Sequence, residues 1–304
     1  MKVRVTSALA GERADRIISL LTGVSRSAAA AAVTEGRVFL GEQRLFSGSR
    51  RLREGEEITI PTFETEVSSG LEPEADISFQ VLYEDQHVII VEKPAGLIVH
   101  PGSGHETGTL SNGLLASYPE LSEIGEPRRP GIVHRLDRGT SGLLMVARSV
   151  VAYRELVKQL AAREIDRRYL CLVYGRVEAE EGIVEAPIGR SHSDRTRMAV
   201  AVDGREARTR YRVDRRCSDP AVTLLRCQLE TGRTHQIRVH MGAIGHPVVG
   251  DRVYGRSGDH MGLDRLFLHA DYLGFIHPVC GEPMYFESTL PGELDALLMD
   301  LLFV

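Results

Sequence analysis

Asp137 has the sequence setting that most strongly suggests chemistry. It lies in the run His134-Arg135-Leu136-Asp137-Arg138-Gly139-Thr140-Ser141-Gly142, a series of polar and turn-forming residues directly before the apolar residues 143–147. A loop that enters a buried strand holds its side chains on a rigid scaffold, and an aspartate beside an arginine and a histidine can act as an acid, a base or a nucleophile. The competing interpretation is structural, because most aspartates in such loops only hydrogen-bond nearby backbone amides and shape a turn.

Two further segments carry residues of the same kind. Tyr169 follows Arg167-Arg168 at the expected start of a strand, and Arg238 lies in the polar stretch 229–240. Each has an ordinary structural explanation, since an isolated tyrosine is more often a residue at the edge of a core and an isolated arginine more often joins a surface ion pair. The chemical hypothesis therefore depends on whether the fold brings the three segments together.

Hydrophobic periodicity predicts the elements that would position these residues. We expect strands at residues 81–83, 88–91, 142–148, 169–174, 209–213 and 222–229. Ser149 should cap a helix that runs to about Arg163, and Thr234 should cap another, with Ile237, Met241 and Ile244 facing inward and Gly245 and Pro247 ending it. Strands and helices mix without regular βαβ alternation, which favours an α+β sheet protein over a doubly wound fold.

Residues 1–60 are predicted to form a separate, small α+β unit. Helices are expected at residues 12–22 and 26–35, the first ended by Gly23, the second capped by Ser25 and ended by Gly36. Residues 37–40 and 44–46 should form a hairpin, and residues 58–60 a further strand. Residues 61–76 are acidic and show no periodicity, so we expect a linker there, followed by a second domain at residues 77–304.

The basic residues of the first unit suggest binding to nucleic acid. The chain has 304 residues and a net charge of −5, but residues 1–60 carry ten Lys+Arg against seven Asp+Glu. Only Lys2, Lys93 and Lys158 of the 37 basic residues are lysines, and arginine suits bidentate phosphate contacts and stacking on bases. Genomic base composition is an alternative reason for the arginine content. The arginines that could line one binding face are Arg26, Arg37, Arg50, Arg51 and Arg53.

Several classes of protein do not fit the sequence. No apolar run approaches the roughly 20 residues of a membrane span, and Met1-Lys2-Val3-Arg4 lacks the apolar core of a signal peptide, so we expect a cytoplasmic protein. The four cysteines form no C-x-x-C pair, and His235 and His240 are five apart, so we expect reduced thiols and no metal site. Pro101-Gly102-Ser103-Gly104 matches neither a P-loop nor a dinucleotide fingerprint, so no nucleotide cofactor is expected.

The first unit resembles the S4 RNA-binding domain. The matching motifs are Arg13-Ala14-Asp15-Arg16, Val24-Ser25-Arg26-Ser27, Glu35-Gly36-Arg37-Val38 and Glu54-Gly55-Glu56-Glu57-Ile58. The sequence departs from the family in the hairpin, where Leu40-Gly41-Glu42 stands in place of the usual Val-Asn-Gly. The resemblance implies binding to RNA, and of the basic cluster we expect Arg26, Arg37 and Arg51 to contact it.

The rest of the chain resembles the RluA-type pseudouridine synthases, in particular the RluD-like branch that acts on large-subunit ribosomal RNA. The resemblance covers residues 93–102, the H-R-L-D-x-x-T-S-G signature at 134–142, residues 231–240, residues 245–251 and Leu268-His269-Ala270. Arg138-Gly139 fills two variable positions where Lys-Asp is common, and Cys280 stands where threonine is frequent. The resemblance implies a mixed, mainly antiparallel sheet with flanking helices, and the isomerisation of uridine to pseudouridine in RNA without cofactor or metal.

The same resemblance implies roles for single residues. Asp137 matches the essential carboxylate, whose target is C1′, C6 of the base or a proton in a glycal route. Tyr169 matches the tyrosine that stacks on the target base and can serve as a base, and Arg238 matches the partner of the aspartate. Arg135 matches the residue that fills the space left in the RNA when the base is flipped out. We also expect RNA contacts from His134, Arg233 and His235.

The expected substrate is 23S rRNA, in particular the helix 69 stem-loop, with the large-subunit precursor as partner. One alternative is another rRNA or tRNA uridine, because paralogues differ in target. A second alternative is a non-catalytic RNA-binding or ribosome-assembly protein. A third is a hydrolase that uses His134 and Asp137, but the sequence has no G-x-S-x-G nucleophile elbow.

Overall fold

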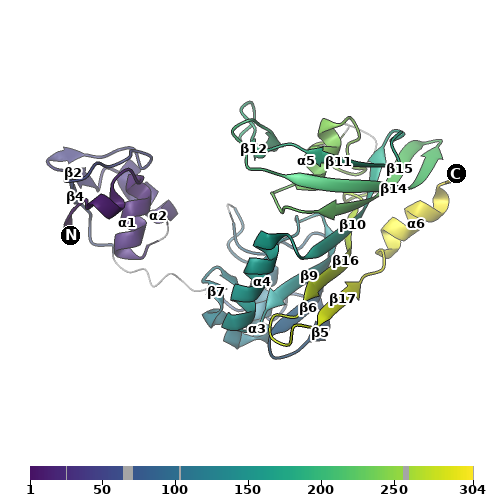
Figure 1. Cartoon of the computed structure of the whole chain (residues 1–304), viewed down its shortest axis with the longest axis horizontal. Helices are drawn as coiled ribbons and strands as arrows, with labels where there is room; N and C mark the ends of the chain where they lie inside the picture. Colours follow the sequence, from purple (N-terminus) through teal and green to yellow (C-terminus); the bar gives the residue numbers. More distant parts are fainter. Residues whose placement is uncertain (25, 64–70, 103, 256–259, 304) are drawn as a thin grey trace. The chain divides into compact units, whose positions relative to one another are not determined.

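In a computed structural model the chain forms two compact units, Met1–Gly70 and Leu71–Val304 (Figure 1). The structure describes residues 1–24, 26–63, 71–102, 104–255 and 260–303, and for residues 8, 26 and 27 it describes the backbone alone. The predicted cap at Ser25 and the side chain of Arg26 therefore lie outside the described residues.

The first unit packs two helices on a small antiparallel sheet, as predicted. Its strands, in spatial order, are β1 (Lys2–Arg4), β4 (Glu57–Thr59), β2 (Phe39–Leu40) and β3 (Gln43–Arg44), and its helices are the short 3-10 helix η1 (Ser7–Leu9), α1 (Ala14–Thr22) and α2 (Arg26–Thr34). The predicted hairpin is present, because β2 pairs with β3 through Phe39 and Arg44. Gly23 ends α1 in the left-handed conformation (φ 76°) that glycine adopts without strain.

Small side chains determine the packing of this unit. Ala29 and Ala32 of α2 are fully buried and belong to one core cluster with Ile17 of α1 and Ile58 of β4. Because alanine projects only a methyl group, a run of alanines lets one helix come close to another. The alanines of α2 therefore allow this helix to pack closely in the core of the first unit.

The second unit is built on one large, mainly antiparallel sheet. Within the described residues its strands, in spatial order, are β11 (Glu181–Glu185), β14 (Arg208–Ser218), β15 (Ala221–Leu229), β10 (Asp166–Tyr174), β16 (Leu268–Ile276), β9 (Ser141–Ala147), β6 (Val88–Lys93) and β5 (Gln80–Glu84), with β17 (Pro283–Glu287) paired to β16. Parallel pairing joins β16 to β9, where His269 lies opposite Ser141 and Ala270 opposite Gly142. The prediction of a mixed, mainly antiparallel α+β fold is confirmed.

Short elements and helices complete the second unit. The remaining elements are α3 (Leu110–Ser117), the 3-10 helix η2 (Pro119–Glu123), β7 (Gly125–Glu126), β8 (Arg129–Pro130), α4 (Val150–Ala162), β12 (Ile188–Arg190), β13 (Met198–Val200), α5 (Gln236–Ala243) and α6 (Gly292–Asp300). Ser149 caps α4 as predicted, accepting a hydrogen bond from the Ala152 amide. Within the described part of the chain, every helix is too short or too polar to cross a lipid bilayer.

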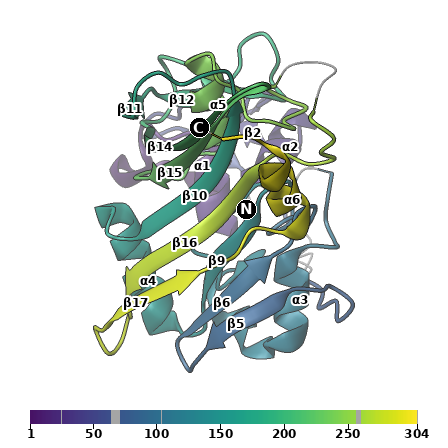
Figure 2. The ribbon, with the colours of Figure 1, turned by 90° about the vertical axis from the view of Figure 1, so that its right-hand side faces the viewer.

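The two faces of β10 support two different cores. Tyr169, Cys171 and Val173 belong to the main core together with Leu156 of α4, whereas Leu172 and Tyr174 pack with α6 in a second core. Figure 2 looks at the face that carries α6. Since side chains alternate along a strand, Arg167 and Tyr169 project to the same face, away from α6.

Three predictions need correction. Leu71 is buried in the main core, and Asn112 Nδ2 donates to the Glu72 carbonyl at 2.8 Å, so residues 71–76 belong to the second unit rather than to the predicted linker. The predicted cap at Thr234 is wrong, because α5 begins at Gln236 with His235 as its N-cap residue. Ile244, expected to face inward, is exposed.

Gly142 allows the close approach of β9 and β16, and we predict that an added methyl group disrupts it. Its φ is 111°, and a Cβ there would lie 2.2 Å from the Ala270 carbonyl oxygen. We therefore expect Gly142→Ala to lower the free energy of unfolding by about 1–3 kcal/mol, measured by urea denaturation. Gly292→Ala is the control, because nothing lies within 4 Å of that position and its φ is ordinary. Equal stability of the two variants would contradict this account.

Candidate active site

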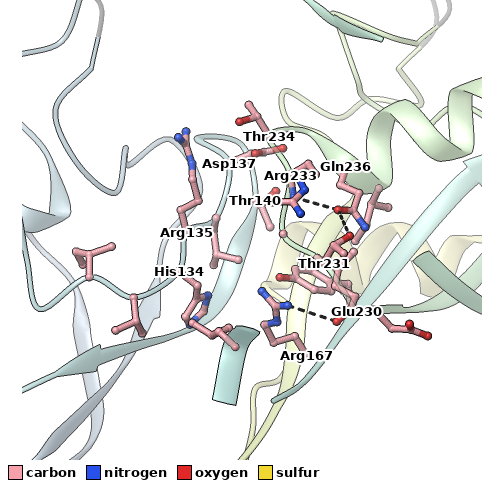
Figure 3. A pocket seen from close by; sticks show the side chains of 18 of the residues that line it. His134, Arg135, Asp137, Thr140, Arg167, Glu230, Thr231, Arg233, Thr234 and Gln236 are labelled. Carbon is pink, nitrogen blue, oxygen red and sulfur yellow. Dashed lines mark hydrogen bonds between the residues drawn. The ribbon is translucent and has the colours of Figure 1, made fainter. Parts of the chain in front are cut away.

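The three predicted segments meet at one cavity of about 500 Å³. One wall is the loop with His134, Arg135 and Asp137, and the facing wall is the segment between β15 and α5 (Figure 3). Arg167 and Tyr169 of β10 also line the cavity. The fold thus joins residues that are separated by more than ninety positions in the sequence, which the sequence could only suggest.

Arg238 lies against Asp137, but its stronger partner is a second carboxylate. Its Nη1 donates to Asp137 Oδ2 at 3.3 Å, whereas its Nε and Nη2 donate to Asp251 Oδ2 and Oδ1 at 2.6 and 3.0 Å. The guanidinium carbon also lies 4.9 Å from the centre of the Tyr254 ring. Arg238 and Asp251 are 6% and 1% exposed, so this bidentate pair is buried and fixes the arginine in the orientation that reaches Asp137.

Asp251 depends on this pairing for its charge. Burial acts to raise its pKa, but hydrogen bonds from Arg238 and from the Tyr254 and Val253 amides, with the arginine's charge, outweigh burial and leave the pKa below its ordinary value. Asp251 was not among the predicted site residues, although it ends the segment 245–251 that resembles the family. Its role depends on a contact across a turn, which residue spacing does not reveal.

A buried lysine anchors the loop of Asp137. Lys93, at the end of β6, is fully buried, and its Nζ donates to the carbonyl oxygens of Pro94 at 2.7 Å, Leu97 at 2.8 Å and Arg138 at 3.4 Å. The Gly96 amide donates to the same Arg138 carbonyl at 2.7 Å. Burial, together with the charge of Arg265, lowers the pKa of Lys93 to about 7. The carbonyl of Arg138, next to Asp137, is therefore held by two donors, one at the end of β6 and one in the loop that follows it.

Tyr169 presents an aromatic ring and a protonated hydroxyl to the cavity. The residue is 4% exposed, and burial raises its pKa to about 12 even though the charge of Arg167 acts to lower it. A phenol with this pKa keeps its proton at neutral pH, so in the resting site Tyr169 can stack and donate a hydrogen bond. Its predicted service as a base would require a partner that accepts this proton.

Gln236 organises the segment that leads into α5. Its side chain accepts from Thr231 Oγ1 at 2.7 Å and from the Arg233 amide at 3.0 Å, and it donates to the Arg208 carbonyl and Thr209 Oγ1, each at 3.0 Å. His235 adopts a left-handed conformation (φ 57°) at the helix start. The buried amide thus replaces the predicted threonine cap and fixes Arg233 at the cavity wall.

Only some of the residues predicted to contact RNA line the cavity. His134, Arg135 and Arg233 line the cavity, and Arg135 is exposed. His235 is not among the lining residues; its Nδ1 lies 2.8 Å from the Tyr254 hydroxyl. In the first unit, Arg37 and Arg51 are exposed.

His134 contributes a neutral ring to the cavity wall. Burial, with the nearby charge of Arg167, lowers its pKa to about 3. Its Nε2 accepts a hydrogen bond from the Met145 amide at 3.0 Å, which places the proton on Nδ1. His134 is therefore an uncharged hydrogen-bonding group at neutral pH, and a hydrolase that uses it as a strong base is not supported by this geometry.

The arrangement suits chemistry on a planar, uncharged group that enters the cavity. A carboxylate is oriented by a fixed guanidinium, and an aromatic ring provides a stacking surface. No group of three or more His, Cys, Asp or Glu within the described ranges is arranged to hold a metal ion. The site thus brings together the components of acid–base or nucleophilic catalysis on a ring.

Comparison with solved structures defines the class of fold. The chain is similar to human RNA pseudouridylate synthase domain containing 1, with a TM-score of 0.58 and 28% identity over 74% of this chain and 90% of that one. The fold is therefore that of the pseudouridine synthases.

Sequence comparisons establish the family. Residues 87–243 match the RNA pseudouridylate synthase family. The chain is 49% identical to ribosomal large subunit pseudouridine synthase D of Nitrosomonas europaea, over 80% of this chain and 71% of the relative, and 42% identical to an uncharacterised RNA pseudouridine synthase of Bacillus subtilis, over 95% and 94%. The chain belongs to the RNA pseudouridylate synthase family, and it is an RNA pseudouridine synthase.

We predict that Asp251 supports both stability and activity through Arg238. Asp251→Asn removes the charge that compensates a buried guanidinium, so we expect a loss of about 3 kcal/mol in the free energy of unfolding and about a 100-fold loss in kcat as Arg238 shifts. Urea denaturation and a pseudouridine-formation assay measure the two effects. Arg252→Gln is the control, because the ion pair of Arg252 with Asp264 is exposed to solvent.

The pH dependence of this loss has a defined sign. Because the folded-state pKa of Asp251 is lowered, its stabilisation is present above the unfolded pKa of about 3.9 and is lost as the pH falls through the folded value. The stability difference between wild type and Asp251→Asn should therefore shrink on acidification below about pH 4. A difference that stays constant with pH would argue against the ion pair as its source.

Proposed function

We propose that this protein converts uridines of 23S rRNA to pseudouridine, with Asp137 as the essential carboxylate. The observation that carries the proposal is the contact of Asp137 with the buried, doubly paired Arg238 at the wall of the cavity. Support for the substrate comes from the relative in Nitrosomonas europaea, whose name specifies the large ribosomal subunit.

The reaction is an isomerisation that needs no net input of atoms. The N1–C1′ bond breaks with its electron pair passing to the uracil, the ring turns, and C5 bonds to C1′. The proton on C5 is then lost and N1 is protonated, which restores a neutral pyrimidine. Asp137 takes part by attack at C1′, by attack at C6 or by proton transfer in a glycal route.

The target base must leave the RNA stack before it can reach the cavity. Tyr169 offers a surface on which the extruded base can stack, which offsets part of the cost of unstacking. Arg135 is exposed at the cavity wall, where it can fill the space that the base leaves. His134, as a neutral hydrogen-bonding group, and Arg233 would contact the nucleotide from opposite walls.

The first unit would bind RNA as an S4-like module and direct the enzyme to the helix 69 stem-loop of 23S rRNA in the large-subunit precursor. Two helices on a small antiparallel sheet and the exposed Arg37 and Arg51 support this assignment. Alternative functions are modification of another rRNA or tRNA uridine, and ribosome assembly without catalysis. The contact of Arg238 with Asp137, which lines the cavity, favours a catalytic role over ribosome assembly without catalysis.

We predict that Asp137→Asn abolishes catalysis without preventing RNA binding. The amide keeps the size of the carboxylate but removes its charge and basicity, so pseudouridine formation on 23S rRNA fragments should fall by at least about 1,000-fold. Thermal unfolding of the variant checks that the fold is intact, and Asp264→Asn, at an exposed position, is the matched control. Retained activity in a folded variant would remove Asp137 from the mechanism.

Cells that lack this protein test the target. Pseudouridines mapped across rRNA and tRNA should disappear from helix 69, and wild type but not Asp137→Asn should restore them. Loss of a signal elsewhere would identify the alternative substrate. A complete map without change would favour the non-catalytic role.

We further predict that Arg37 and Arg51 contribute phosphate contacts. The double variant Arg37→Gln/Arg51→Gln should weaken binding to 23S rRNA fragments and reduce the slope of log K against log salt by about one to two, because each lost phosphate contact releases roughly one counterion fewer. Binding titrations from low to moderate salt measure the slope. Lys158→Gln, which changes an exposed residue of α4, is the control. An unchanged slope would show that these two arginines do not contact phosphate.

A further inference from the structure

Arg167 is a buried cation with little compensation. The residue is 7% exposed, lies on β10 and lines the cavity. Its Nη2 donates to the Leu229 carbonyl at a long 3.5 Å, and its Nε has no hydrogen-bond partner among the described residues. Burying a guanidinium without a carboxylate or a full set of acceptors costs stability, so the cost calls for a functional reason.

The groups around the Arg167 guanidinium do not neutralise its charge, and the side chain lines the cavity. Within the described part of the chain, no carboxylate forms an ion pair with Arg167. The neighbouring cavity-lining group is His134, whose ring is neutral (Figure 3). Gly232 leaves room for the guanidinium, because a Cβ there would lie 3.1 Å from Arg167 Nη1.

The position of Tyr169 indicates which part of a bound substrate would lie next to Arg167. The two residues are two positions apart on one face of β10, about 7 Å along the strand, so a guanidinium at Arg167 can reach the edge of a ring that rests on Tyr169. RNA phosphates remain outside such a pocket, since only the flipped base enters it. The occupant that faces Arg167 is therefore the edge of the base, which in uracil carries the carbonyl oxygens O2 and O4.

We propose that Arg167 contacts a carbonyl oxygen of the flipped uracil and stabilises the negative charge that the ring gains when the N1–C1′ bond breaks. The inference rests on the proposed function, because it requires the target uracil to occupy this cavity. The electron pair of the broken bond is delocalised from N1 over O2 and O4, and the arginine, a permanent donor, strengthens its hydrogen bond as that charge develops. When C5 bonds to C1′ the charge returns to the new bond, and the ring is free to leave.

Substitution of Arg167 separates this role from a structural one. Arg167→Met keeps length and apolar volume, so kcat for pseudouridine formation should fall about 100- to 1,000-fold while KM changes little, as for loss of one oxyanion donor. The melting temperature should stay the same or rise, because an uncompensated buried charge is removed. Arg167→Lys keeps the charge and should retain more activity. Arg168→Met is the control, since Arg168 lies on the opposite face of the same strand, where it is exposed and pairs with Asp166.

Thio-substituted RNA tests the contact itself. Sulfur accepts hydrogen bonds poorly, so a target uridine with 2-thio or 4-thio substitution should slow the wild type at one of the two positions, and the same substitution should have little further effect in Arg167→Met. Full kcat in Arg167→Met, or equal thio effects at both positions in both proteins, would overturn the inference. A wild type that modifies a different RNA would contradict the proposed target alone, because the same comparison of variants then applies on that RNA.

Discussion

The site depends on one shared guanidinium. Arg238 is buried between Asp251, which it grips through two hydrogen bonds, and Asp137, which it touches through the remaining nitrogen. A buried ion pair is costly unless its geometry is tight, and here the tight pair is the one between Arg238 and Asp251. The pair with Asp251 thus fixes the orientation of Arg238 and leaves Nη1 for the longer contact with Asp137.

The backbone that carries Asp137 depends on a second set of buried polar groups. Beneath the loop, Arg265 donates to Ser141, whose hydroxyl lies 2.8 Å from His269 Nδ1. The series of hydrogen bonds continues from His269 Nε2 to Ser288 Oγ at 2.9 Å, and Ser288 Oγ donates to Glu92 Oε1 at 2.7 Å. Burial lowers the pKa of His269 to about 4, so the ring stays neutral and passes hydrogen bonds in one direction, from guanidinium to carboxylate. Lys93 and this hydrogen-bonded series thus hold the loop of Asp137 at Arg138 and at Ser141.

The sequence predicted the parts of this arrangement that depend on local pattern. The α+β class, the cap at Ser149, the strand at residues 169–174 and the candidates Asp137, Tyr169 and Arg238 follow from periodicity, turn residues and motifs that resemble those of the family. It could not predict Asp251 as the partner of Arg238 or Gln236 as the organiser of α5, because both act through contacts that the tertiary fold creates. It also extended the linker too far, since Leu71 has no periodic neighbours and is buried only by packing against a distant part of the chain.

Arg167, which lines the cavity, and Arg238, which lies behind Asp137, are both buried but have different electrostatic surroundings. Arg238 meets two carboxylates, whereas Arg167 meets a neutral histidine, a protonated tyrosine and one distant carbonyl. An enzyme gains rate only from interactions that are stronger in the transition state than in the resting site. A guanidinium that is paired with carboxylates can orient a neighbouring group, but it has few free donors for an anion that forms during the reaction. A guanidinium without a carboxylate partner interacts weakly in the resting site and strongly with a negative charge that develops on the substrate. Stability lost at Arg167 in the free protein is thus available to a substrate that becomes negatively charged during reaction.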